Sequence, residues 1–145
     1  MALHTVTALA TIPAIAITLA TFSASIEPEP DRAGWRETQW SAHLAESVDG
    51  VAEYRLPNGA RVDIVEEVEG GPRIAWEVDW STKGAEAIGQ AVQYAAQLNA
   101  ESPTEPGVWL LLKGRSDEDY LECLAGVTYL RGFGVPIHLR TTRTP

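Results

Sequence analysis

Residues 61–80 read RVDIVEEVEGGPRIAWEVDW, and this stretch predicts a β-hairpin that bends at Gly70. In an antiparallel pair centred on that residue, partners lie at equal distances from the bend, so Asp63 faces Glu77. Like charges that face each other across a strand pair lower stability. A cation or a substrate that needs both carboxylates would offset this effect. Asp63 and Glu77 are therefore the first candidates for a functional site.

The same register predicts two ion pairs and one apolar face. The ion pairs join Arg61 to Asp79 and Glu67 to Arg73. The apolar face has the alternation of a strand pair covered on one side, with Glu66 as the exception, and consists of Val62, Ile64, Ile74, Trp76, Val78 and Trp80. A two-residue turn at the glycine pair would send the two acids to opposite faces, but it would also break up the apolar face. The first register is therefore preferred.

Length and composition indicate a single globular domain rather than a disordered chain. The chain has 145 residues, of which 45% are apolar, and a formal net charge of -9. An acidic domain repels phosphate backbones unless basic residues cluster locally, so this charge counts against avid binding of nucleic acid. The single cysteine, Cys123, excludes an internal disulfide in the monomer, and its apolar helical surroundings predict a buried thiol. The three histidines do not have the spacing of a zinc site.

Residues 1–25 differ from the rest of the chain because they contain no Lys, Arg, Asp or Glu. Their apolar run ends in small residues that suit a signal peptidase, which predicts a cleaved export signal and a periplasmic or secreted protein. The basic start of a typical signal is missing and the run is long enough to span a bilayer, so a membrane anchor, a mistaken start site and a buried helix stay open as alternatives. Residues 26–34 are interpreted as a linker and residues 35–142 as the folded domain.

Hydrophobic periodicity and turn residues predict the order of elements in that domain. Trp40, Leu44 and Val48 recur as on one face of a helix, and Asn58-Gly59 joins two β-rich runs into a hairpin. The remaining predicted elements are the second hairpin, a helix that opens at Lys83, a central strand within 107–114, a helix capped by Ser116 and a last strand at 135–141. The fold class is therefore α/β (α+β), in the order α-β-β-β-α-β-α-β, with a mixed central sheet flanked by helices.

The helix that opens at Lys83 has two distinct stripes. The predicted apolar stripe contains Ala85, Ile88, Val92, Ala95 and Ala96. The polar stripe contains Glu86, Gln90, Tyr94 and Gln97. A polar stripe of this kind is usually a solvated surface.

Several of these features resemble the PD-(D/E)XK nuclease superfamily. Asp63 on the second strand and Glu77 on the third match its acidic residues, and the helix segment Gln90-Ala-Val-Gln-Tyr94 is similar to the Q-x-x-x-Y motif of its exonuclease branch. The resemblance covers about residues 35–142, and the order of elements is similar to the family core. It implies a restriction-endonuclease-like fold.

One position departs from the family pattern. The lysine that follows the family glutamate by two positions is replaced here by Asp79. Lys83 is the candidate for a relocated lysine, and a solvated residue at the helix start is the alternative. Glu46, near the end of the first helix, lies where many members carry an additional acid.

The resemblance implies a nuclease-like protein that hydrolyses phosphodiester bonds in DNA or RNA, and residues 1–25 predict that this small protein is exported. It implies catalytic roles for Asp63, Glu77, Lys83, Gln90 and Tyr94, and ligation of Mg²⁺ or Mn²⁺ by Asp63, Glu77 and Glu46. Two carboxylates suit Mg²⁺, which keeps several waters when it binds to proteins. The metal would activate water, and the lysine would stabilise developing negative charge.

Two other functions remain open at this point. Loss of the lysine leaves a nuclease-like fold that binds metal without cutting, which would make the protein an inactive binding or interaction module. If residues 5–24 remain as an anchor, the domain would be a membrane-tethered module instead. The five tryptophans are interpreted as core residues rather than platforms for nucleic-acid bases.

Overall fold

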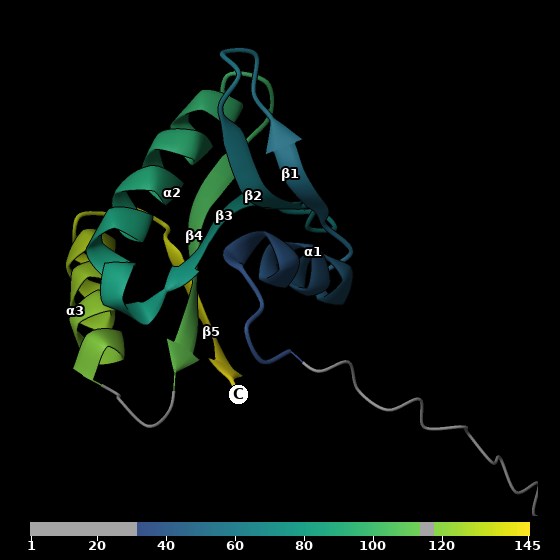
Figure 1. Cartoon of the computed structure of the whole chain (residues 1–145). Coiled ribbons are helices and arrows are strands. Elements are labelled where there is room, and N and C mark those ends of the chain that lie inside the picture. The colour runs from purple at the N-terminus through teal and green to yellow at the C-terminus, as the bar shows by residue number, and fades with distance from the viewer. Residues whose placement is uncertain (1–31, 114–117) are drawn as a thin grey trace, which may run out of the picture. The chain divides into compact units, whose positions relative to one another are not determined.

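The structure is a computed structural model that describes residues 32–113 and 118–145. The predicted export signal or anchor, most of the predicted linker and the predicted cap Ser116 lie outside these residues. The described elements are α1 (Glu37–Ser47), β1 (Val51–Arg55), β2 (Arg61–Glu66), β3 (Arg73–Trp80), a 3₁₀ turn (Ser81–Lys83), α2 (Gly84–Leu98), β4 (Thr104–Lys113), α3 (Glu118–Gly132) and β5 (His138–Thr144) (Figure 1). Among them, no helix is long and apolar enough to cross a membrane.

The described strands form one mixed sheet in the order β1-β2-β3-β4-β5. The first three strands are antiparallel, whereas β4 is parallel to both β3 and β5 because α2 and α3 carry the chain back between them. Helix α1 packs against β1, β2 and β3, and α2 packs against β3 and β4 and beside α3 (Figure 1). The predicted α+β class, with a mixed sheet and flanking helices, is confirmed for the described residues.

The predicted register of the decisive hairpin is confirmed where β2 and β3 pair. Ile64 lies opposite Trp76, and Glu66 lies opposite Ile74. Gly70 has a φ of 70°, a left-handed conformation that glycine adopts without steric cost. The bend at this residue therefore fixes which side chains of the two strands share a face.

The predicted ion pairs of this hairpin are wrong. Arg61 pairs with Glu53 of β1, and Asp79 pairs with Lys83. The ladder between β2 and β3 ends at Ile64, so Arg61 no longer lies beside the far end of β3. The guanidinium of Arg73 donates a hydrogen bond to the carbonyl oxygen of Leu98 at 3.2 Å, which replaces the predicted pair with Glu67.

The prediction is also wrong for Val62, which does not lie on the predicted apolar face. Val62 packs with Val65 and Ala75 in the cluster beneath α2, not with Ile64 on the opposite face. At Val62, β2 still pairs with β1 but no longer with β3. The side chains of β2 therefore no longer alternate between the two faces in step with those of β3.

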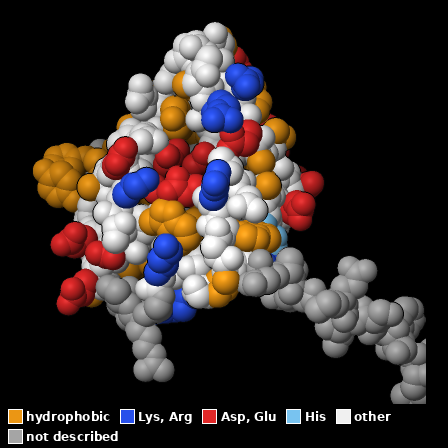
Figure 2. All heavy atoms as spheres, viewed as in Figure 1, with side chains coloured by type: hydrophobic (Ala, Val, Ile, Leu, Met, Phe, Trp, Pro, Cys, Tyr) orange, Lys and Arg blue, Asp and Glu red, His pale blue; other side chains and the backbone are white. Residues whose placement is uncertain are grey.

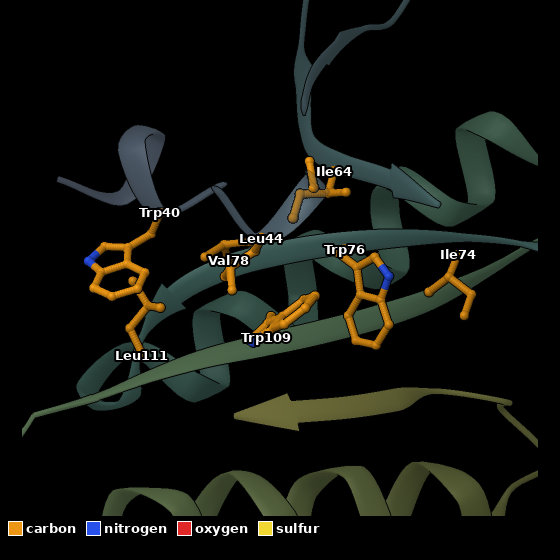
Figure 3. Packing of buried hydrophobic residues seen from close by; sticks show 9 residues of the cluster. Trp40, Leu44, Ile64, Ile74, Trp76, Val78, Trp109 and Leu111 are labelled. Atoms are coloured by element: carbon orange, nitrogen blue, oxygen red, sulfur yellow. The ribbon is translucent and has the colours of Figure 1, made fainter. Parts of the chain in front are cut away.

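The main apolar cluster lies on the α1 side of the sheet. It contains Trp40, Leu44, Ala45, Ile64, Ile74, Trp76, Val78, Trp109 and Leu111 (Figure 3). The rings of Trp76 and Trp109 meet edge to face with centroids 5.4 Å apart. Gly107 makes this packing possible, because a Cβ atom there would lie 2.5 Å from the ring of Trp76. The interpretation of the tryptophans as core residues is confirmed for Trp40, Trp76 and Trp109.

The apolar stripe predicted for α2 is wrong by part of a turn. The residues that face the sheet are Gly84, Ala87, Ala91, Ala95 and Leu98, whereas Ala85, Val92 and Ala96 are exposed. Small side chains at the centre of the contact let the helix approach the sheet closely. Alanines recur around most of this helix, so periodicity alone did not distinguish its two apolar sides.

Two strands begin at residues other than those predicted. β4 begins at Thr104, before the predicted start at Gly107, and β5 begins at His138 rather than at Val135. Val135 instead packs into the cluster under α2 and α3. The predicted burial of Cys123 is confirmed, and desolvation raises the pKa of its thiol to about 11.

Candidate functional site

A cavity of about 430 Å³ opens where the start of α1, the β1–β2 hairpin, β3 and α2 meet. Four predicted site residues line it together, namely Asp63, Glu77, Gln90 and Tyr94. Figure 2 shows acidic side chains gathered in a hollow at the centre of the view, with Lys and Arg side chains around it. The fold therefore brings together residues from two strands and a helix that are far apart in the sequence.

Asp63 is anchored to the neighbouring strand by its side chain. Its Oδ2 accepts a hydrogen bond from the backbone N–H of Val78 at 2.8 Å, although the backbone ladder between the strands has already ended. Burial raises the pKa of Asp63 to about 6, and the charges of Glu53, Glu37 and Asp79 act in the same direction, while the bond from Val78 opposes them. Asp63 thus has a fixed position next to the other acids.

Glu77 is the most unusual acid in the cavity. It is 7% exposed and lines the cavity, and among the described residues no hydrogen bond or ion pair joins its side chain to another. Burial raises the pKa of Glu77 to about 9, with further contributions from Asp63, Asp79, Glu37 and Glu86. A carboxyl whose pKa is shifted this strongly and that faces a cavity beside a second acid is a candidate binding group.

Lys83 bridges two acids, one of which lines the cavity. Its Nζ is 3.2 Å from Oδ1 of Asp79 and 3.4 Å from Oε1 of Glu37. These two contacts raise the pKa of the Lys83 amine, with Asp79 the larger cause. Glu37 lines the cavity, so Lys83 is connected to the site through this carboxylate although it does not line the cavity itself. Asp79 is buried and also accepts a hydrogen bond from the N–H of Trp80.

Gln90 and Tyr94 approach the acids from α2. The Nε2 of Gln90 donates a hydrogen bond to Oε1 of Glu86 at 3.2 Å. The pKa of Tyr94 is raised by burial and then by the charges of Glu77 and Asp63. Gln90 and Tyr94 are partly buried and line the cavity above the acids of β2 and β3, whereas Glu86 on the same stripe is exposed.

The structure places a different acid of α1 at the cavity. Glu46 is exposed near the end of the helix and does not line the cavity, whereas Glu37 in the first helical turn does. The apolar positions Trp40 and Leu44 fix which side of α1 faces the sheet, so helical spacing from them was the available signal for Glu37.

Glu53 is a second lining acid that sequence reasoning missed. It lies within β1 but has a φ of 53°, a left-handed conformation that is unusual for a residue with a side chain. Its carboxylate binds Arg61 across the hairpin, with Oε2 2.5 Å from Nη1. No pattern in the sequence marks a left-handed residue inside a strand.

The donor set suits a hydrated divalent cation. Within residues 32–113 and 118–145, no group of three or more His, Cys, Asp or Glu side chains is arranged to hold a metal ion directly. Asp63 and Glu77 supply carboxylate oxygens at the cavity wall, and Mg²⁺ commonly binds to one or two carboxylates while it retains several waters. A bound cation would also neutralise the charge that accompanies ionisation of both acids.

Comparisons with known proteins give no further assignment. No protein-family model, no curated protein and no solved structure matches this chain. The function must therefore be argued from the chemistry of the cavity.

Proposed function

We propose that this protein is an exported, metal-dependent nuclease-like hydrolase that cleaves phosphodiester bonds in DNA or RNA. The observation that carries the proposal is the meeting of Asp63 and Glu77 with Gln90 and Tyr94 in one cavity. The order of elements and a motif-like segment in α2 support a restriction-endonuclease-like core. The apolar, uncharged residues 1–25 support export to the periplasm or the medium.

The cavity residues have distinct parts in this chemistry. Asp63 and Glu77 would hold Mg²⁺ or Mn²⁺, which when bound supplies an activated water and polarises a phosphoryl oxygen. The N–H of Val78 keeps Asp63 in a fixed orientation. Glu77 gives up its proton when it serves as a ligand, because ligation requires the carboxylate. Gln90 and Tyr94 position the substrate as polar groups on the helical wall.

Lys83 has the part of the relocated lysine in this proposal. Its amine is tied to Glu37, which lines the cavity, and to Asp79, which stands at the usual lysine position. Movement of the amine away from Glu37 toward the substrate would bring a positive charge to the developing negative charge. Replacement of Lys83 by Gln is expected to lower kcat more than it changes KM.

A second candidate function is supported by the same contacts. Both carboxylates near Lys83 already hold its amine, and Asp79 adds negative charge where the family has positive charge. These contacts favour an inactive module that binds a cation or a partner at the acidic cavity. The two candidates predict the same ligand site but opposite results in a cleavage assay.

The deciding experiment measures cleavage of single-stranded and double-stranded DNA and RNA with Mg²⁺, with Mn²⁺ and with EDTA. Wild type is expected to cleave at least one of these substrates in the presence of metal, and Asp63→Asn and Glu77→Gln are expected to be inactive. Glu67→Gln is the matched control, because Glu67 is an exposed acid next to β2 that does not line the cavity. Absence of cleavage by wild type would favour the binding module, and cleavage that persists in both cavity variants would indicate a contaminant.

Export is tested separately by mass spectrometry of protein recovered from the periplasm and from membranes. A cleaved signal removes about 25 residues, as expected from the charge-free stretch 1–25. Recovery of the full-length chain in the membrane fraction would instead support the membrane-anchored alternative.

A further inference from the structure

The cavity is acidic, yet the proposed substrate is anionic. Its lining includes the carboxyl groups of Glu37, Glu53, Asp63 and Glu77. Among the described residues that line it, Arg61 is the one cation. Because acidic walls repel a phosphodiester, the substrate needs a positive group at the position where it enters.

Arg61 has the geometry required of such a group. Its side chain is 54% exposed, and its Nη1 lies 2.5 Å from Oε2 of Glu53. A guanidinium held at one edge still offers N–H donors at its other edge, in the planar arrangement that binds phosphate oxygens. Lys83 is less suitable for this purpose, because its amine already contacts Asp79 and Glu37.

Glu53 holds Arg61 from an unfavourable backbone conformation. Its φ of 53° interrupts β1, and ladder pairs are present on both sides of it, at Ala52 with Ile64 and at Tyr54 with Val62. A left-handed conformation is unfavourable for a residue with a side chain, and such residues cluster at functional sites. In Glu53 this conformation occurs in a residue whose side chain lines the cavity and forms an ion pair with Arg61, the one cationic residue among the described lining residues.

We propose that Arg61, held in place by Glu53, binds a phosphate group of the nucleic-acid substrate at the mouth of the cavity. This inference rests on the proposed nuclease-like function and adds a specific substrate contact to it. Arg61 is the binding residue, and Glu53 is a positioning residue that acts through the guanidinium.

The first test uses inorganic phosphate as the probe and does not depend on catalysis. In NMR spectra of the full chain without divalent metal, the Nε–H signal of Arg61 is expected to shift as phosphate is added. The shift is expected to be lost or strongly reduced in Glu53→Gln, because the guanidinium is no longer oriented. Removal of a negative charge by itself would strengthen phosphate binding, so weaker binding in this variant distinguishes positioning from simple charge.

The second test measures KM and kcat on the substrate that wild type cleaves. Arg61→Gln is expected to raise KM by about tenfold or more, and Glu53→Gln is expected to raise it in the same direction, with a smaller change in kcat. Arg55→Gln is the matched control for charge, since Arg55 lies directly opposite Arg61 in the β1–β2 ladder but does not line the cavity.

A pair of glycine variants separates the role of Glu53 from its strain. Asp49 also has a positive φ, of 51°, but lies outside the cavity, so both Asp49→Gly and Glu53→Gly relieve a left-handed conformation. Both are expected to raise the melting temperature or leave it unchanged. Glu53→Gly alone is expected to raise KM, which a purely structural role would not predict.

The outcomes distinguish this inference from the proposed function. Cleavage with the same KM in Arg61→Gln and Arg55→Gln would overturn the role of Arg61 and leave the nuclease proposal intact. A phosphate-dependent shift at Arg61 without cleavage of any substrate would support the anion site and overturn the nuclease proposal. Absence of both the shift and cleavage would overturn both.

Discussion

Glu66 and Glu77 lie on neighbouring strands of the same hairpin, but the contacts of their carboxyl groups differ. Glu66 projects to the apolar side, where its carboxylate accepts a hydrogen bond from Nε1 of Trp76 at 2.7 Å and lies 3.4 Å from the guanidinium of Arg140. Glu77 is buried on the opposite side, and no described residue forms an ion pair with it. The two acids therefore separate a structural role from a candidate functional one.

The contrast extends to the surroundings of the two acids. Arg140 also stacks over the rings of Trp76 and Trp109, at 4.7 and 5.1 Å from their centroids, so the charge of Glu66 belongs to a packed cluster. Glu77 faces a cavity that contains other acids. The carboxylate of Glu66 is held by protein groups, whereas the carboxyl of Glu77 faces a cavity in which a ligand can reach it.

The largest expected effect is a fall in stability with rising pH, caused mainly by Glu77. Its pKa is about 9 in the folded protein and 4.5 in the unfolded chain, so between these values the folded state keeps a proton that the unfolded state has lost. The contribution of Glu77 to the free energy of unfolding is therefore largest below pH 4.5. It falls by on the order of 3 to 6 kcal/mol as the pH rises toward 9. Asp63 adds a smaller fall between pH 3.8 and about 6.

Urea unfolding at several pH values in EDTA tests this effect. Glu77→Gln is expected to remove most of the decline and to be more stable than wild type near pH 9. Addition of Mg²⁺ is expected to restore stability to wild type at high pH and to have little effect on Glu77→Gln. A wild-type stability that rises steadily from pH 4.5 to pH 9 would contradict the asymmetry between the two acids.

A smaller effect on stability is expected when a methyl group is added to the tightly packed side of the sheet on which Glu66 lies. In Gly107→Ala the new methyl group would lie 2.5 Å from the Trp76 ring and 2.8 Å from the Ile74 side chain. Displacement of these residues is expected to destabilise the protein by about 2 to 3 kcal/mol. The control is Gly89→Ala on the exposed side of α2, where no atom lies within 4 Å and a gain of about 0.5 to 1 kcal/mol is expected. Equal effects of the two substitutions on urea unfolding would show that this face is not tightly packed.

Loss of the ion pair between Glu66 and Arg140 is expected to lower stability by a similar or slightly smaller amount than Gly107→Ala. Arg140→Ala removes one partner of Glu66 and the cation that covers two tryptophan rings, so a loss of about 2 kcal/mol is expected. The Arg140 side chain is 39% exposed, which keeps the expected loss below the range for fully buried pairs. In a double-mutant cycle with Glu66→Gln, the two losses should be less than additive. Full additivity would show that Glu66 does not depend on Arg140.

Local rules predicted the parts of the fold that depend on near neighbours in the chain. Gly70 set the register of β2 and β3, and Asn58-Gly59 marked the first hairpin. Asp63 and Glu77 line the same cavity, although the ladder ends at Ile64 and does not pair them, and Asp63 reaches β3 through its side-chain bond to Val78 instead. The spacing of Gln90 and Tyr94 on a helix placed both residues at this cavity.

The remaining site residues depend on how separate elements meet. Spacing from Trp40 and Leu44 places Glu37 on the sheet-facing side of α1, but Glu37 reaches the cavity only because α1 packs against β2 and β3, which a helical pattern does not determine. Glu53 depends on a left-handed residue inside β1, and propensity favours an extended conformation there. The partners of Lys83 come from α1 and β3, so its contacts also depend on how these elements pack. Glu66 appeared as an exception because its partner Arg140 lies on β5, far along the chain.

The smallest expected effect uses Tyr94 as a reporter of charge on the acidic side. The charges of Glu77 and Asp63 contribute to its raised pKa after burial. Glu77→Gln is therefore expected to lower the pKa of Tyr94 toward its ordinary value without reaching it, because the burial remains. Glu66→Gln, on the other side of the hairpin, is expected to leave the titration of Tyr94 unchanged. The ¹³Cζ resonance of labelled Tyr94, followed by NMR above pH 9, measures both variants. A larger response to Glu66→Gln than to Glu77→Gln would mean that the charge sensed by Tyr94 does not come from the cavity.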